Sequence, residues 1–185
     1  MGTNAANSRP HNVRQISGQQ LFFSRDIPAA LVSDLNQLLS EDSKRPSQAG
    51  FSFTDLNPPN ELEAGLIEIK ANWPDYVDPY FALFKFYFRA AKYRQAEIIV
   101  WQAAKMLSQR KGFPLNYRLL KSDTTDWLEN DSDQRHFLFC MKALGVIRLR
   151  RGKVFLAKKV LTKLIELDPH DEIGGGNFLD IAASF

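Results

Sequence analysis

The sequence has a single cysteine, Cys140, so the chain cannot form an internal disulfide. Such sparing use of cysteine is typical of a reducing compartment. Histidine is scarce as well: His11, His136 and His170 stand far apart, with no Cys pair and no His-Glu-x-x-His motif nearby. These residue types are the usual ligands of zinc and related metals. We therefore expect no metal site and no cofactor.

Long apolar runs are missing too. No stretch approaches the roughly 20 apolar residues needed to cross a bilayer, and residues 1–7 are polar where a secretory leader would be apolar. We therefore expect a soluble cytoplasmic protein without membrane association. The net charge is only +3, so the overall charge does not indicate a partner.

No catalytic constellation is evident. Cys140 follows His136 by one helical turn, but its sequence neighbours are large and apolar, which is typical of a buried thiol. The run Gly174-Gly175-Gly176 is similar to an anion-binding loop, yet no lysine follows it and no strand precedes it. A turn that allows close helix approach is the better interpretation. We predict no catalytic residue and no enzymatic activity.

Helical periodicity is what the sequence does contain, and sustained strand-type alternation is absent, so the predicted class is all-α. Residues 1–20 are polar and are expected to form a disordered tail, followed by a single helical domain over residues 21–185. The expected helices are Pro28 to about Leu39, residues 60–74, two helices within 77–110 that part near Ala91-Lys92, two between His136 and Leu167 that part at Gly152, and a short helix over 176–185.

The pair at 138–171 carries a repeat pattern. Gly145 and Ala157 provide small residues for a close helix crossing, Gly152 marks the turn between the helices, and Pro169 ends the unit. This spacing resembles a tetratricopeptide repeat, a helix pair of 34 residues that stacks on its neighbours. The sequence departs from the family pattern at Met141, where tryptophan is usual, and at Arg148, where tyrosine is usual.

The pair at 77–110 resembles the same repeat less closely, because Phe84 stands where a small residue is expected. The resemblance implies a half repeat at 60–74, a capping helix at 176–185 and an insert at 111–135 that interrupts the array. The alternative is an unrelated helical bundle. In the 77–110 pair, the positions that match the register of the tetratricopeptide pattern are Tyr80, Leu83, Tyr87, Tyr93 and Ala96.

A second resemblance is narrower. It rests on five short motifs and points to small tetratricopeptide proteins encoded among bacterial nitrogen-fixation genes. It implies an accessory role in nitrogenase maturation or regulation, with a protein partner and no known reaction. The motifs are Phe84-Lys85-Phe86-Tyr87-Phe88, Gly112-Phe113-Pro114, Asp126-Trp127, Lys142-Ala143-Leu144 and Leu167-Asp168-Pro169.

In tetratricopeptide arrays the first helix of each pair lines a concave groove. The resemblance therefore implies a mixed apolar and basic groove, suited to a protein or peptide segment with apolar and acidic side chains. The residues that it places in the groove are Phe81, Lys85, Phe88, Arg89, Lys142, Val146, Leu149 and Arg150.

The stretch 142–163 holds eight basic residues and no acidic one. It could be a solvated face, a surface for an acidic protein or, as the alternative function, a nucleic-acid-binding surface. Nucleic acid is the least favoured of the three. The acid-rich segment 122–133 could lie against this stretch and neutralise part of its charge.

Overall fold

The computed structural model describes residues 15–16, 19–20, 27–43, 60–129 and 132–185. In this part of the chain the fold is helical apart from a ribbon of two very short antiparallel strands, β1 (Gln15–Ile16) and β2 (Gln19–Gln20). The helices are α1 (Ala29–Ser43), α2 (Asn60–Asn72), α3 (Val77–Arg89), α4 (Tyr93–Lys111), α5 (Asp133–Arg150), α6 (Val154–Leu167) and α7 (Gly176–Ala183), with a 3-10 turn, η1, at Tyr117–Leu119.

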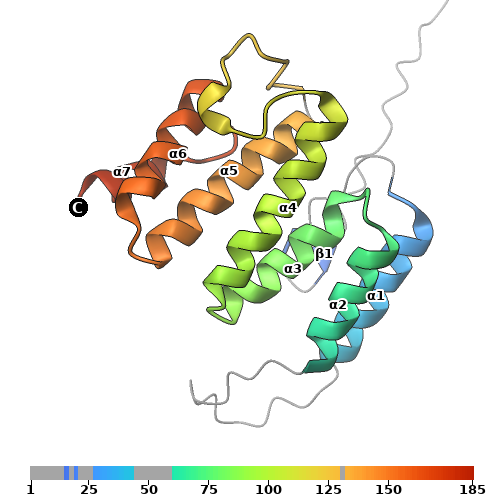
Figure 1. Cartoon of the computed structure of the whole chain (residues 1–185). Coiled ribbons are helices and arrows are strands. Elements are labelled where there is room, and N and C mark those ends of the chain that lie inside the picture. Colours follow the sequence, from blue (N-terminus) through green and yellow to red (C-terminus); the bar gives the residue numbers. More distant parts are fainter. Residues whose placement is uncertain (1–14, 17–18, 21–26, 44–59, 130–131) are drawn as a thin grey trace, which may run out of the picture.

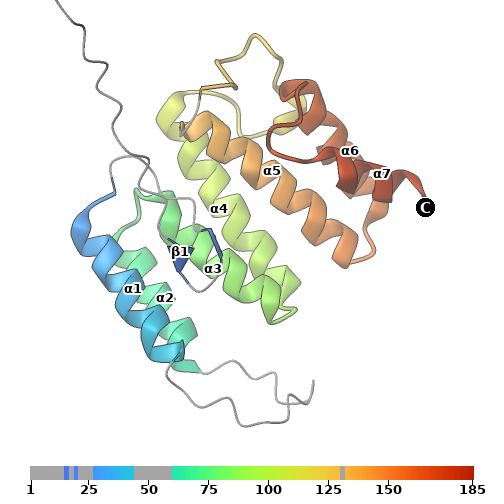
Figure 2. The same ribbon diagram turned by 180° about the vertical axis from the view of Figure 1, so that it is seen from behind.

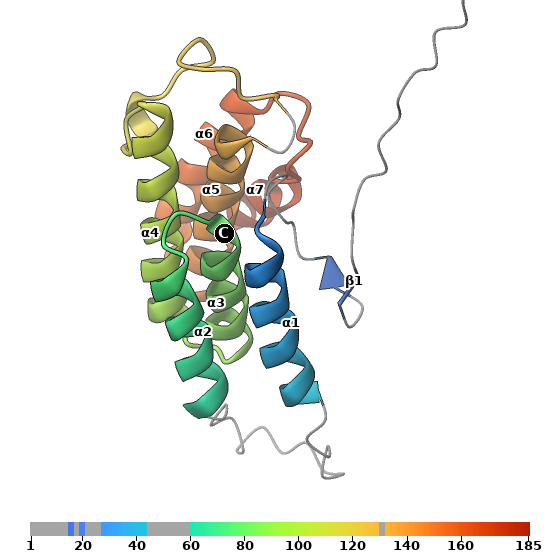
Figure 3. The same cartoon turned by 90° about the vertical axis from the view of Figure 1, so that its right-hand side faces the viewer.

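The helices stack side by side in chain order, from α1 at one end to α7 at the other (Figures 1 and 2). Each helix packs mainly on the helices before and after it in the sequence. A view along the stack places α2 and α4 on one side and α1 and α7 on the other (Figure 3). The chain therefore forms consecutive antiparallel helix pairs, which agrees with the predicted all-α class.

The turns of two helix pairs have the same geometry. Residues 90–92 join α3 to α4 and residues 151–153 join α5 to α6. In the first turn Ala91 has a φ of 53° and the Lys92 amide donates to the Tyr87 carbonyl; in the second, Gly152 has a φ of 68° and the Lys153 amide donates to the Arg148 carbonyl. Both breaks fall where the sequence predicted them.

Small residues permit the close crossing of α5 and α6, as expected from Gly145 and Ala157, but the atoms nearest to Gly145 belong to Leu161. A Cβ built on Gly145 would lie 2.5 Å from both Cγ and Cδ2 of Leu161, which is one helical turn beyond Ala157. Ala157 is itself fully buried. The crossing point is therefore set by Gly145 and Leu161, with Ala157 as a second tightly packed position.

The region predicted as an irregular insert is held by an aromatic cluster. Trp127 is 3% exposed and its ring lies 5.3 Å from that of Phe113, which in turn lies 4.9 Å from Phe137 on α5. The Trp127 indole nitrogen donates to the Lys121 carbonyl at 2.9 Å. The connection between α4 and α5 is thus packed onto the core.

The loop before α7 is organised by two carboxylates. The Ile173 amide donates to Asp168, which is fully buried, and the amides of Gly175 and Gly176 donate to Asp171. A Cβ on Gly175 would lie 2.6 Å from Leu164 Cδ2. Gly175 therefore permits the close approach of α7 to α6, in line with the turn that the sequence predicted.

The predicted tail of residues 1–20 lies mostly outside the described residues. The observed helix bounds otherwise follow the prediction closely. The exceptions are α1, which extends to Ser43 rather than to about Leu39, and α5, which begins at Asp133 instead of His136. Ser132 caps α5 by accepting a hydrogen bond from the Arg135 amide. The sequence did not predict this cap, because the helix was expected to begin at His136. Among the described helices, none has the length and apolarity to cross a membrane.

Candidate functional site

The α3 part of the predicted groove contains residues in three environments. Phe81 is buried, and its ring packs 4.8 Å from Phe139 and 5.9 Å from His136. Lys85 and Phe88 are half-buried, and Arg89 is exposed. The Phe88 ring also contacts Tyr93 at 5.4 Å. Phe81 therefore supports the site from within the core, while the other three residues reach the surface.

Lys85 lies in an unfavourable electrostatic setting. Burial lowers its pKa, the like charge of Arg89 lowers the pKa further, and Asp78 opposes both effects. Lys85 and Arg89 are one helical turn apart, a spacing at which like charges destabilise a helix by about 0.2–0.5 kcal/mol. A negative group placed beside them would relieve this repulsion.

The α5 part is a mixed stripe along one side of the helix. Val146 and Leu149 are half-buried and Arg150 is exposed. Lys142 is half-buried, its Nζ donates to the Ile173 carbonyl at 2.7 Å, and it lies 5.7 Å from the Phe178 ring centre. Lys142 thus fastens the loop before α7, so its charge is partly engaged within the chain.

Phe139 joins the two parts, although the sequence interpretation did not place it in the groove. It is half-buried on α5, and its ring contacts Phe81 and Phe84 of α3. Its position one turn before Lys142 on the stripe was the available signal. We call the half-buried and exposed residues Lys85, Phe88, Arg89, Phe139, Lys142, Val146, Leu149 and Arg150 the α3/α5 face.

The basic stretch 142–163 does not form one free surface. Glu97 of α4 binds both Arg148, with Nε to Oε1 at 3.2 Å, and Arg151. Arg148 also stacks over Trp101 at 6.0 Å. Charges far apart in the sequence are therefore neutralised between α4 and the end of α5.

Other members of the stretch are engaged differently. Lys163 pairs with Glu166 at 2.6 Å and donates to the Leu120 carbonyl at 3.2 Å, while Lys159 lies over the Phe155 ring at 4.2 Å. Lys153 and Lys158 are exposed. The positive charge available to a partner is thus smaller and more scattered than the sequence indicates.

The acidic segment does not neutralise the basic stretch as expected. Where the structure describes its carboxylates, the ion pair formed is that of Asp133 with Arg110 of α4, at 3.2 Å. Asp131 lies outside the described residues. The insert instead contacts α6 at the Leu120 carbonyl, which accepts a hydrogen bond from Lys163. Its path is set by the packing of Phe113 and Trp127 against Phe137 of α5.

Cys140 is a free, buried cysteine on α5. Burial raises the pKa of the Cys140 thiol well above its usual range, so the nucleophilic thiolate is disfavoured at neutral pH. Within the described ranges, no three His, Cys, Asp or Glu side chains gather as a metal-binding group.

Comparison with known proteins finds a weak similarity. A protein of Azotobacter chroococcum mcd 1, named "Uncharacterized 19.8 kDa protein in nifW 5'region", is 26% identical over 133 residues, which are 65% of this chain and 69% of that protein. No protein-family model matches the chain, and no solved structure matches it. The chain is thus weakly similar to a protein from a nitrogen-fixation gene region.

Proposed function

We propose that the chain is a non-enzymatic interaction module of the tetratricopeptide type, acting in the cytoplasm as an accessory factor in nitrogen fixation. It binds an acidic, partly apolar protein segment along the α3/α5 face. The weak similarity to a protein in the nifW 5′ region supports the biological setting. The repeated turns at 90–92 and 151–153 support the repeat architecture.

One observation carries the choice of partner. Lys85 is half-buried beside the like charge of Arg89; burial and Arg89 lower its pKa, while Asp78 acts in the opposite direction. An acidic side chain of a partner would offset the repulsion between the two cations and could form a charge-assisted hydrogen bond with the exposed Arg89. Phe88 on α3 and Val146 and Leu149 on α5 are also half-buried, so apolar side chains of the same segment have surface on which to pack.

Binding energy should come mostly from the apolar contacts. Aromatic residues near the centre of an interface tend to carry the largest loss on truncation, while charges at the rim act on association rate and salt response. Phe88 is the half-buried aromatic beside the cations. Arg89, being exposed, is expected to steer the partner more than to hold it.

The nucleic-acid alternative has weaker support in the structure. It requires a continuous basic surface over 142–163, but Lys142, Arg148 and Lys163 have partners inside the chain. We therefore prefer a protein partner and treat nucleic-acid binding as an outcome that the test can reveal.

The test is capture of partners from extracts of the native cell with three forms of the full chain. The first is wild type, the second carries Lys85→Glu and Arg89→Glu, and the third carries Lys105→Glu and Lys111→Glu. Lys105 and Lys111 are exposed on α4, so the third form matches the change in charge at another surface. A protein retained by wild type and by the α4 variant, but lost by the α3 variant, supports the proposal. Equal recovery by all three forms, or recovery of nucleic acid alone, contradicts it.

A further inference from the structure

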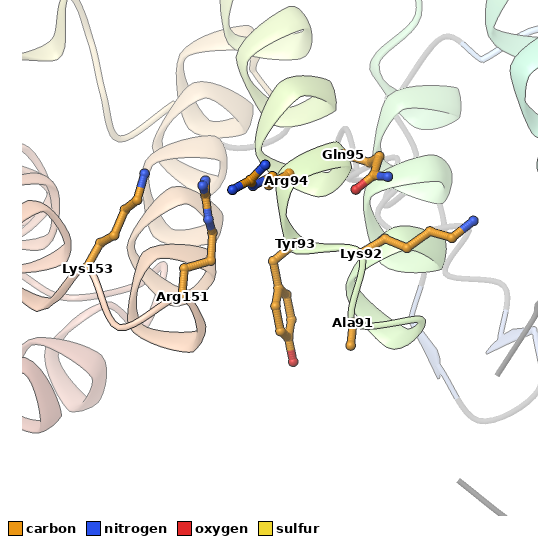
Figure 4. Close-up of a pocket in the computed structure, with 7 residues that line it drawn as sticks. All are labelled: Ala91, Lys92, Tyr93, Arg94, Gln95, Arg151 and Lys153. Carbon is orange, nitrogen blue, oxygen red and sulfur yellow. The ribbon is translucent and has the colours of Figure 1, made fainter. Parts of the chain in front are cut away.

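The two equivalent turns come together at one end of the stack and border an open pocket of about 470 Å³. Its lining contains four basic residues and no acidic one. The lining residues are Ala91, Lys92, Tyr93, Arg94, Gln95, Arg151 and Lys153 (Figure 4). Pockets of this volume are typical of small-molecule sites, but the lining here is polar and cationic.

Two of the four cations have an acidic partner within the chain. The Lys92 ammonium pairs with Glu63 at 2.7 Å. Arg151 shares the Glu97 carboxylate with Arg148, so one negative charge serves two guanidinium groups. Arg151 is thereby held in place at the pocket while its positive charge is only partly compensated.

The other two cations have no internal counter-charge. Arg94 and Lys153 are exposed, and neither side chain has an ion-pair or hydrogen-bond partner among the residues that the structure describes. Figure 4 shows the Arg94 side chain extending toward Arg151. Guanidinium groups on one pocket wall can bind oxyanions through paired, charge-assisted hydrogen bonds.

The backbone adds to this positive potential. The pocket includes the N-cap residues of two helices, Lys92 for α4 and Lys153 for α6. Neither helix has a side-chain cap, and neither has an acidic residue in its first turn. Helix N-termini carry partial positive charge that favours phosphate groups.

We propose that this pocket binds the diphosphate or triphosphate group of a compact ligand. A multiply charged group matches several cations at one place better than a single carboxylate does. The limited extent of this basic surface favours a small ligand over a nucleic-acid strand, because the basic residues that would extend it, Arg148 and Lys163, are engaged elsewhere. The proposal does not depend on the protein-binding function, since it concerns a separate set of side chains.

The test is an NMR titration of the isotope-labelled full chain with pyrophosphate, ATP and adenosine. Pyrophosphate and ATP are expected to shift the amide signals of residues 91–95 and 151–153, and adenosine is not. Equal affinity for pyrophosphate and ATP would identify the phosphate group as the whole determinant. Tighter binding of ATP would identify a nucleotide as the natural source of that group.

A matched pair of variants separates this site from general charge attraction. The Arg94→Gln/Lys153→Gln variant should bind pyrophosphate at least about tenfold more weakly, because charge-assisted hydrogen bonds to the phosphate are lost. The Lys158→Gln/Lys159→Gln variant removes the same charge from the exposed side of α6 and should bind as wild type does. The four substituted positions are all exposed. Unchanged dispersion of the amide signals verifies that each variant is folded. Absence of shifts with pyrophosphate and ATP, or equal weakening in the two variants, would overturn the proposal.

Discussion

Gly145 of α5 and Leu161 of α6 are in such close contact that a methyl group on residue 145 would overlap the leucine side chain, with separations of 2.5 Å to its Cγ and Cδ2. Leu161 is fully buried, so it has little room to move. The absence of a side chain at position 145 therefore determines how closely this helix pair can pack.

This contact predicts the effect of Gly145→Ala. Overpacking costs about 1–3 kcal/mol, while alanine regains up to about 1 kcal/mol of helix propensity. We expect a net loss of about 1–2 kcal/mol in the free energy of unfolding, measured by urea denaturation. In a Leu161→Ala background the same change should become neutral or stabilising. If the loss persists without the leucine, the proposed clash is not its cause.

Ala91 offers a gain in stability. Its φ of 53° lies in the left-handed region, where glycine is favoured, and the equivalent position of the second turn is Gly152. We expect Ala91→Gly to stabilise the protein by about 0.5–1 kcal/mol. Ala90→Gly is the control, because Ala90 has a φ of −74° and should lose stability on the same change. Thermal melts of both variants distinguish relief of strain from a general effect of glycine.

Glu97 holds Arg148 and Arg151 together, with 10–18% of each side chain exposed. Glu97→Gln would leave two guanidinium groups close to each other without a counter-charge. We expect a loss of about 2–4 kcal/mol in the free energy of unfolding, near the range for breaking a buried ion pair. Glu166→Gln tests the exposed pair with Lys163 and should cost no more than about 1 kcal/mol. Similar losses in the two variants would contradict a special role for Glu97.

Ionisation of Tyr87 should make the free energy of unfolding depend on pH in the alkaline range. Burial raises its pKa to about 12, with a hydrogen bond to Glu63 as the next cause. Between pH 10 and 12 the unfolded chain loses this proton while the folded chain keeps it, so the stabilisation present below pH 10 falls as pH rises. The loss should reach about 2–3 kcal/mol by pH 12. Tyr87→Phe should flatten the decline in urea denaturation across this range, and an unchanged slope would refute this assignment.

The helices could be predicted because their limits depend on local chemistry. Gly152 and Gly112 end helices by adopting positive φ, and both are visible as glycines after periodic segments. The break at Ala91-Lys92 was predicted as well, although no glycine marks it. Pro74 and Pro169 gave similar local signals at the ends of α2 and α6.

The side-chain partners could not be predicted in the same way. Glu97 is separated from Arg148 by 51 residues in sequence, and nothing local to either residue indicates their pairing. The acidic segment was expected to meet the basic stretch on the basis of charge alone. Its course is set instead by the packing of Trp127 against Phe113 and Phe137, a tertiary contact that charge patterns do not encode.

The most direct test of the central proposal, that the α3/α5 face binds an acidic and partly apolar protein segment, is site-specific photo-crosslinking in the native cell. A photoreactive amino acid is placed at position 89 on the face or, as control, at position 111, where Lys111 is exposed at the end of α4. We predict that position 89 crosslinks to one protein, that mass spectrometry maps the link to a segment rich in acidic and apolar residues, and that Phe88→Ala reduces its yield. Equal crosslinking of the same protein from position 111, or no protein crosslink from position 89, would contradict the proposal.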